Sequence, residues 1–174
     1  MHIIGEKVLL RAIEESDSEL LLEMINDPEI ERAVGGWSFP SSSYSHNEWF
    51  KRQATSTNAL RCIIESLLDG QAVGMTSLTD IDHKNGTASS SVKLSKNGHG
   101  KGYGIDGHRA ILAYAFEELR LNCINASVLE DNVVSLKMCE KLGFKTEGVL
   151  RQRVFKQGKY LNVISLSLLR DEFL

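Results

Sequence analysis

The most informative stretch of the chain reads Gly98-His99-Gly100-Lys101-Gly102-Tyr103-Gly104. It lies between a predicted strand that ends near Lys93-Leu94 and a predicted helix, because the following side chains recur at helical spacing. The core face of that helix consists of Ile105, His108, Ile111, Leu112, Ala115, Phe116 and Leu119. Glycines permit positive φ and close backbone approach, and a helix start offers free N–H groups. The stretch is therefore a candidate phosphate-binding loop, to which Lys101 adds a positive charge.

Two known phosphate-binding patterns fit this loop poorly. The Walker A pattern fails because no Gly-Lys pair is followed by Ser or Thr. Gly102–Gly107 does match G-x-G-x-x-G, but a dinucleotide fold needs an acidic residue at the end of the next strand. The segment Leu121–Ser127 contains none. A nucleotide-binding enzyme that uses Gly102–Gly107 stays open as a hypothesis, although this context disfavours it.

Outward from the loop, strand and helix patterns alternate along the chain. The predicted strands are 7–13, 59–66, 71–79, a strand after the Asn85-Gly86 turn, 122–129, 143–155 and 160–169. Besides the long helix, a helix is predicted to follow Ser16, a short one to cover 46–54, and one to begin at Asn132 and end before Gly143. The order predicts an α/β fold, a mixed sheet with helices on its faces.

The region around the first helix carries three further signals. Ser16-x-x-Glu19 fits a capping box, and Asp27-Pro28 is expected to end the helix. Residues 28–45 read as a long loop that holds Trp37 and Phe39, either a lid or a loop pinned to the core. The many acidic residues of the helix and its exit would attract a cationic acceptor, but a solvated charged face explains them better.

The composition limits the classes of protein to which this chain can belong. With 174 residues, 42% hydrophobic and 25% charged, the chain is expected to form a single domain over 1–174. A net charge of −3 disfavours a nucleic-acid partner. The histidines show no metal-ligand spacing, and three cysteines without a C-x-x-C pair favour reduced thiols. Without a signal-peptide pattern or a long apolar run, no membrane contact and a cytoplasmic location are expected.

Two motifs in order resemble the GNAT superfamily of N-acetyltransferases. His99–Gly104 resembles its Q/R-x-x-G-x-G/A loop, and Asn132–Phe144 resembles its later N-x-x-[AS]-x-x-x-x-E-K-x-G-F element. The closing Glu147–Arg151 and Gly158–Tyr160 resemble the Rim-type branch of ribosomal-protein, spermidine and amino-sugar acetyltransferases. The resemblance covers nearly the whole chain. It implies a mostly antiparallel twisted sheet flanked by helices.

The resemblance also implies a cosubstrate and a site. Acetyl-CoA would lie with its pyrophosphate on the glycine loop and its pantetheine along a strand that splays from its neighbour. The cofactor-binding positions carried over are Val92, Lys93, Leu94, His99, Gly100, Lys101, Gly102, Tyr103, Gly104, Ile105 and Asn132, with Ser135 and Lys141 as further candidates. An amine acceptor would attack the thioester directly, and the N–H near Leu94 would stabilise the oxyanion. The acceptor would be a polyamine, an amino sugar or a peptide N-terminus.

Three positions depart from the family pattern. His99 stands where Arg or Gln opens the loop, so any side-chain contact to phosphate becomes pH-dependent. Cys139 stands where many members have a Tyr that protonates the leaving thiolate. A thiol can donate a proton, but a buried cysteine is commonly core, so both roles stay open. Related branches often place a Glu base on the strand where this chain reads Ser89-Ser90-Ser91, so no base is assigned.

The missing Glu and Tyr keep a second class of function open. The chain could be a non-catalytic module that binds acyl-CoA as a sensor. Dimers are common among similar proteins, so a homodimer is a further expectation from the resemblance, although no interface is visible in the sequence.

Overall fold

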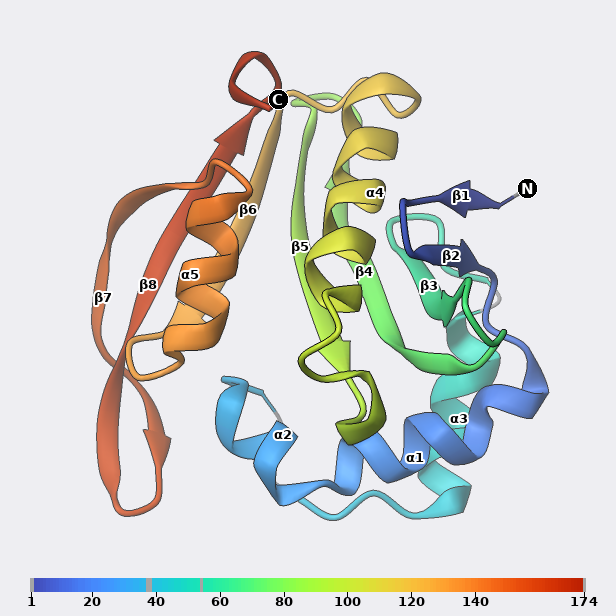
Figure 1. Ribbon diagram of the computed structural model, residues 1–174. Helices are drawn as coiled ribbons and strands as arrows, with labels where there is room; N and C mark the ends of the chain where they lie inside the picture. Colours follow the sequence, from blue (N-terminus) through green and yellow to red (C-terminus); the bar gives the residue numbers. More distant parts are fainter. Residues whose placement is uncertain (1, 37–38, 54, 174) are drawn as a thin grey trace.

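The computed structural model describes residues 2–36, 39–53 and 55–173. Within these residues, eight strands form one sheet, and five α-helices cover it (Figure 1). The strands are β1 (Ile3–Ile4), β2 (Val8–Arg11), β3 (Leu60–Ser66), β4 (Ala72–Asp82), β5 (Thr87–Leu94), β6 (Cys123–Leu129), β7 (Lys145–Lys156) and β8 (Lys159–Leu169). The helices are α1 (Ser18–Asn26), α2 (Pro28–Ala33), α3 (Ser43–Gln53), α4 (Tyr103–Glu117) and α5 (Val133–Lys141). Short 3-10 turns cover Glu15–Asp17, Lys96–Gly98 and Arg170–Glu172.

The strand order is β1-β2-β3-β4-β5-β6-β8-β7, and only the β5–β6 pair is parallel. The predicted α/β fold with a mixed, mostly antiparallel sheet is confirmed. The parallel pair is short: it covers Thr87–Ser89 against Cys123–Asn125, and the two strands then diverge (Figure 1). This divergence splits the lower part of the sheet into two halves.

The main core lies between the sheet and α4. Ile111 and Leu112 on the predicted apolar face of α4 are fully buried, and they pack with Leu78 of β4 and Ile124 of β6. Burial of each such side chain contributes about 2 kcal/mol. Because side chains alternate along a strand, the positions between these face the other side of the sheet, toward α1 and α3. The sheet therefore has helices on both faces.

The start of the first helix differs from the prediction. The described residues contain no Ser16–Glu19 capping box; a 3-10 turn precedes α1, and the Glu14 N–H donates to the Asp17 carboxylate at 2.8 Å. Asp17 is 4% exposed, and Arg11 donates to both of its oxygens at 2.8 and 2.9 Å. The ion pair with a strand residue thus holds Asp17, the N-cap residue of α1, in place.

The expected loop over 28–45 contains the short helix α2, so that part of the prediction is wrong. Asp27 is its N-cap and accepts from the Glu29 N–H at 2.8 Å, while Pro28 occupies the first helical position. Proline is favoured there because the N–H it lacks would have no helical partner. The Asp-Pro pair thus ends one helix and begins the next. Trp37 lies outside the described residues.

Candidate active site

A cavity of about 440 Å³ lies where β5 and β6 diverge. Residues from both faces of the sheet line it. Ser90 and His108 come from the α4 face, while Ser91 and Lys93 come from the face toward α1 and α3. The cavity therefore passes through the sheet, and molecules on the two faces can meet in it.

The open edge of β5 presents backbone amides to this cavity. Ser95 donates its N–H to the Val73 carbonyl at 2.9 Å, so the alternate residue Lys93 has its N–H turned toward β4 as well. The amide groups of Val92 and Leu94 therefore point toward β6, which has diverged from β5 at this level. Within the described residues the N–H groups of Val92 and Leu94 have no strand partner, so they can pair with a bound molecule.

The glycine loop forms a second set of free donors. Six consecutive N–H groups, Gly100 to Ile105, donate to no backbone carbonyl of the described chain. The first helical bond of α4 runs from the Asp106 N–H to the Gly102 carbonyl, 3.2 Å apart. Gly102 is the N-cap, with φ +84°, which turns the chain into the helix in a conformation that L-residues avoid. The free amides and the positive end of the helix dipole can hold an anion.

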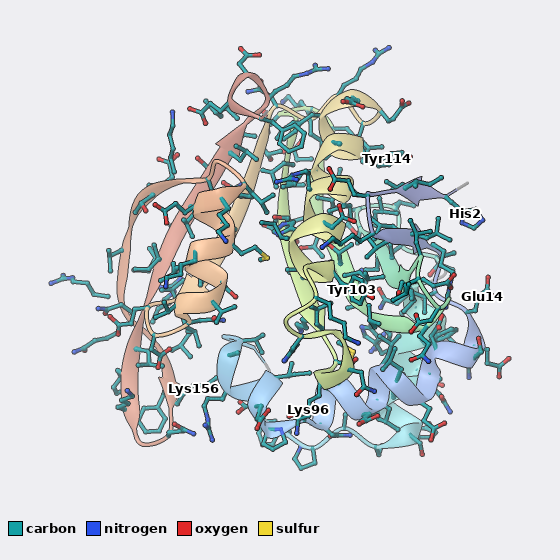
Figure 2. All side chains as sticks on the ribbon, in the orientation of Figure 1. His2, Glu14, Lys96, Tyr103, Tyr114 and Lys156 are labelled. Carbon is teal, nitrogen blue, oxygen red and sulfur yellow. The ribbon has the colours of Figure 1, made fainter. Side chains whose placement is uncertain are left out.

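Two predicted loop residues use their side chains elsewhere. His99 Nε2 lies 3.3 Å from the Leu94 carbonyl and so ties the loop to β5. Tyr103 is 6% exposed, lies at the start of α4 (Figure 2), and accepts a hydrogen bond from Ser66 at 3.1 Å. Only the backbone of Tyr103 is available to a ligand at the loop. The Lys101 ammonium lies 5.9 Å from the Tyr103 ring centre.

Sequence reasoning missed a second lysine beside the loop. Lys7 donates from Nζ to the Lys101 carbonyl at 3.3 Å. It is brought there by the buried carboxylate of Asp106, which accepts from the N–H groups of Glu6, Lys7 and Val8 at 3.1, 2.7 and 3.1 Å. Lys7 is 94 residues from Lys101 in sequence, so no local pattern could have revealed it.

The start of α5 borders the cavity from the opposite half of the sheet. Asn132 caps the helix as predicted, accepting from the Ser135 N–H at 3.1 Å, and its Nδ2 donates to the Ala33 carbonyl of α2 at 2.9 Å. Both Asn132 and Ser135 line the cavity. Lys141 is exposed at the end of α5 and is not among the described lining residues. The structure thus brings two of these three candidates to the site.

Two basic side chains hold α2 beside the opening. Lys156 of β7 is 6% exposed and donates to the Glu31 carboxylate and carbonyl. Lys96 lies 3.4 Å from the Asp27 carboxylate. Figure 2 shows these lysines on opposite sides of α2. The contacts join α2 to both halves of the split sheet.

The Cys139 thiol lines the cavity and is 2% exposed. Burial raises its pKa to about 11, so the thiol keeps its proton at neutral pH. The same shift makes it a weaker acid than a free thiol. The side chain also belongs to the main core cluster. Its position fits a proton donor and a packing residue equally.

His108 makes one of its two possible hydrogen bonds. Its Nε2 lies 2.9 Å from the Ser90 hydroxyl, while Nδ1 has no partner among the described residues. Burial lowers the pKa of His108 to about 4, so the ring is neutral at physiological pH. A ring with so low a pKa is too weak a base to take up a proton from an amine at neutral pH. His108 is buried, as its position on the apolar face of the helix predicted.

The face toward α1 and α3 carries two cationic side chains, and sequence reasoning did not select Arg61. Arg61 of β3 and Lys93 of β5 both line the cavity and are half-buried. Burial lowers both pKa values, and the charge of Arg61 lowers that of Lys93 further. Lys93 was chosen for its backbone, and its side chain is a separate feature.

The described residues contain no group of three or more side chains arranged to hold a metal ion. No described helix is long and apolar enough to span a membrane.

Comparison with known proteins gives consistent matches over the chain. Residues 7–145 match the family described as "Acetyltransferase (GNAT) domain". The SPbeta prophage-derived uncharacterized N-acetyltransferase YokL of Bacillus subtilis is 33% identical over 169 residues, 97% of this chain and 93% of the relative. The spermidine N(1)-acetyltransferase of Escherichia coli is 24% identical over 98% of this chain and 90% of its own length. The crystal structure of spermidine N-acetyltransferase from Vibrio cholerae in complex with CoA and spermine superposes with a TM-score of 0.90 at 22% identity, covering 97% of this chain and 98% of that one. At this low identity, the similarity to the Vibrio cholerae structure shows a shared fold.

Proposed function

Because this chain belongs to the acetyltransferase (GNAT) family, we propose that it moves the acetyl group of acetyl-CoA to a primary amine by direct attack in a ternary complex. The observation that carries the proposal is the cavity that passes through the sheet between β5 and β6. Acetyl-CoA would enter from the face that carries the glycine loop. The amine would enter from the face toward α1 and α3. Both reactants are then present together, and no acetyl-enzyme is needed.

Two sets of free amides support this placement of acetyl-CoA. The six N–H groups of Gly100–Ile105 would bind the pyrophosphate, assisted by the charges of Lys7 and Lys101. The backbone of Val92 would pair with the pantetheine arm, which would take the place of the missing strand neighbour, and the N–H of Leu94 would remain for the thioester. Asn132 and Ser135 would border the arm from the α5 side.

The same geometry suits the chemical steps. The neutral amine attacks the thioester carbon, and the Leu94 N–H stabilises the oxyanion that forms. The carbon–sulfur bond then breaks, and the CoA thiolate takes up a proton. Cys139 would donate that proton if it acts as the acid, and water would donate it if Cys139 only packs. No carboxylate lies at Ser89–Ser91 to serve as the base, so the amine proton would leave to solvent.

Initial-rate kinetics test the proposal. CoA release is measured while acetyl-CoA and one amine are varied together over a panel of polyamines, amino sugars and peptides. Direct transfer predicts intersecting double-reciprocal lines. Parallel lines would indicate an acetyl-enzyme and refute the ternary complex. Tight acetyl-CoA binding in calorimetry without release on any amine would instead support the sensor. Binding of NAD or ATP in place of acetyl-CoA would support the nucleotide enzyme.

Three broader expectations belong to the same proposal. Residues 1–174 would form one N-acetyltransferase domain, the chain would act in the cytoplasm, and it would pair as a homodimer. Light scattering of the purified protein tests the dimer, and limited proteolysis tests the single domain.

A further inference from the structure

We propose that the acceptor amine also carries an anionic group, a carboxylate or a phosphate, which Arg61 and Lys93 bind. The inference rests on the proposed acetyl transfer and narrows its substrate class. It disfavours polyamines, whose further charges are positive.

The cross-strand register places the two cations on one face. Arg61 pairs with Ser77, which in turn pairs with Ser91. The Ser77 and Ser91 hydroxyls lie 2.8 Å apart, which fixes these positions on the same face. Lys93 follows two residues later and shares that face. Two strand spacings, about 10 Å, separate the backbones of Arg61 and Ser91. The cavity thus has a polar floor between two long basic side chains.

Neither cationic side chain has an ion-pair partner among the described residues. The side chains of Arg61 and Lys93 make no hydrogen bond or ion pair to any described residue, and the acidic group that acts on Arg61 is the exposed Asp80. Among the described lining residues, the only carboxylate is Glu31, which Lys156 binds. Two half-buried like charges repel each other, and a bound anion would relieve that cost.

The sheet face that carries Arg61 and Lys93 lies opposite the glycine loop, which would bind the coenzyme phosphates. Leu94 packs beside Gly104 of α4, and Ser90 lies within hydrogen-bond distance of His108 on α4, whereas Arg61 and Lys93 face α1 and α3. The pair is therefore placed for the second substrate. About 440 Å³ must hold both the acetylated end of the coenzyme and the acceptor, which favours a small acceptor.

Matched acceptors test the inference. CoA release is measured with β-alanine, propylamine and diaminopropane, which share a three-carbon chain, and with ethanolamine phosphate against ethanolamine. We expect the anionic members to have a kcat/KM about tenfold or more above their neutral and cationic partners. A preference for β-alanine identifies a carboxylate, and one for ethanolamine phosphate identifies a phosphate.

Three variants separate binding from folding. Arg61→Gln and Lys93→Met should each remove most of that preference while KM for acetyl-CoA changes by less than about twofold. Lys93→Glu should favour diaminopropane over β-alanine, a reversal that loss of packing cannot produce. Lys84→Gln, an exposed lysine in the β4–β5 turn, serves as the control with an unchanged preference.

The outcomes distinguish this inference from the proposed function. Equal rates within each set, or faster release with diamines, would overturn the anionic acceptor and leave acetyl transfer standing. No release from any amine, although acetyl-CoA binds, would refute the transfer itself, and the anionic acceptor would fall with it.

Discussion

Replacing Gly102 by valine tests whether the glycine loop binds acetyl-CoA. Gly102 has φ +84° and caps α4, and an added Cβ would lie 3.1 Å from the mobile Nζ of Lys7. The side chain can move, so the main cost is the left-handed backbone, about 1–2 kcal/mol for an L-residue. The loop can relieve this strain by turning Gly102 to negative φ. That rotation would redirect the neighbouring amides away from the bound anion.

The size of the effect follows from the hydrogen bonds. A hydrogen bond to a charged group contributes about 1.5–3 kcal/mol, so losing two costs at least about 3 kcal/mol. We therefore expect the acetyl-CoA Kd of Gly102→Val to rise about a hundredfold. Isothermal titration calorimetry measures the Kd, and denaturant unfolding measures the stability.

Gly70→Val is the matched control for this experiment. Gly70 has φ +69° in the β3–β4 turn, with no atom within 4 Å of an added Cβ. It carries the same type of backbone strain outside the glycine loop. Its free energy of unfolding should fall by a similar amount, while acetyl-CoA affinity stays unchanged. A folded Gly102→Val protein with wild-type affinity would refute the assignment of the loop.

Two other predictions concern groups that line the cavity. Cys139→Ala should lower kcat strongly if the thiol protonates the CoA thiolate, whereas a loss below about threefold, ~0.7 kcal/mol of barrier, would show that it only packs. His108 stays neutral down to a pKa of about 4 in the native state and binds a proton near pH 6.5 when unfolded. The free energy of unfolding should therefore fall as the pH drops from about 6.5 to about 4, by up to ~1.4 kcal/mol per unit. His108→Leu should flatten this part of the profile in denaturant titrations, and equal slopes in both proteins would contradict the buried neutral ring.

The elements that sequence predicted well are those with local causes. The apolar spacing of α4, the alternate glycines before it and the Asn132 cap each arise from residues within a few positions of one another. Helix α2 was not predicted, although the residues that begin it, Asp27 and Pro28, are also neighbours in the sequence. Asp27-Pro28 fits both the end of a helix and the start of one, and only the contacts of α2 with the rest of the protein select the second.

Sequence alone was enough to predict the kind of fold and to select the glycine segment as a candidate anion site, because periodicity, glycine placement and capping are properties of neighbouring residues. Tertiary structure alone decided where β5 leaves β6, that Asp106 brings Lys7 to the loop, and that Arg61 shares a cavity with Lys93. These contacts join residues that lie tens of positions apart. Strand register and the packing of the helices set such distances, and neither is encoded in any single stretch of the chain.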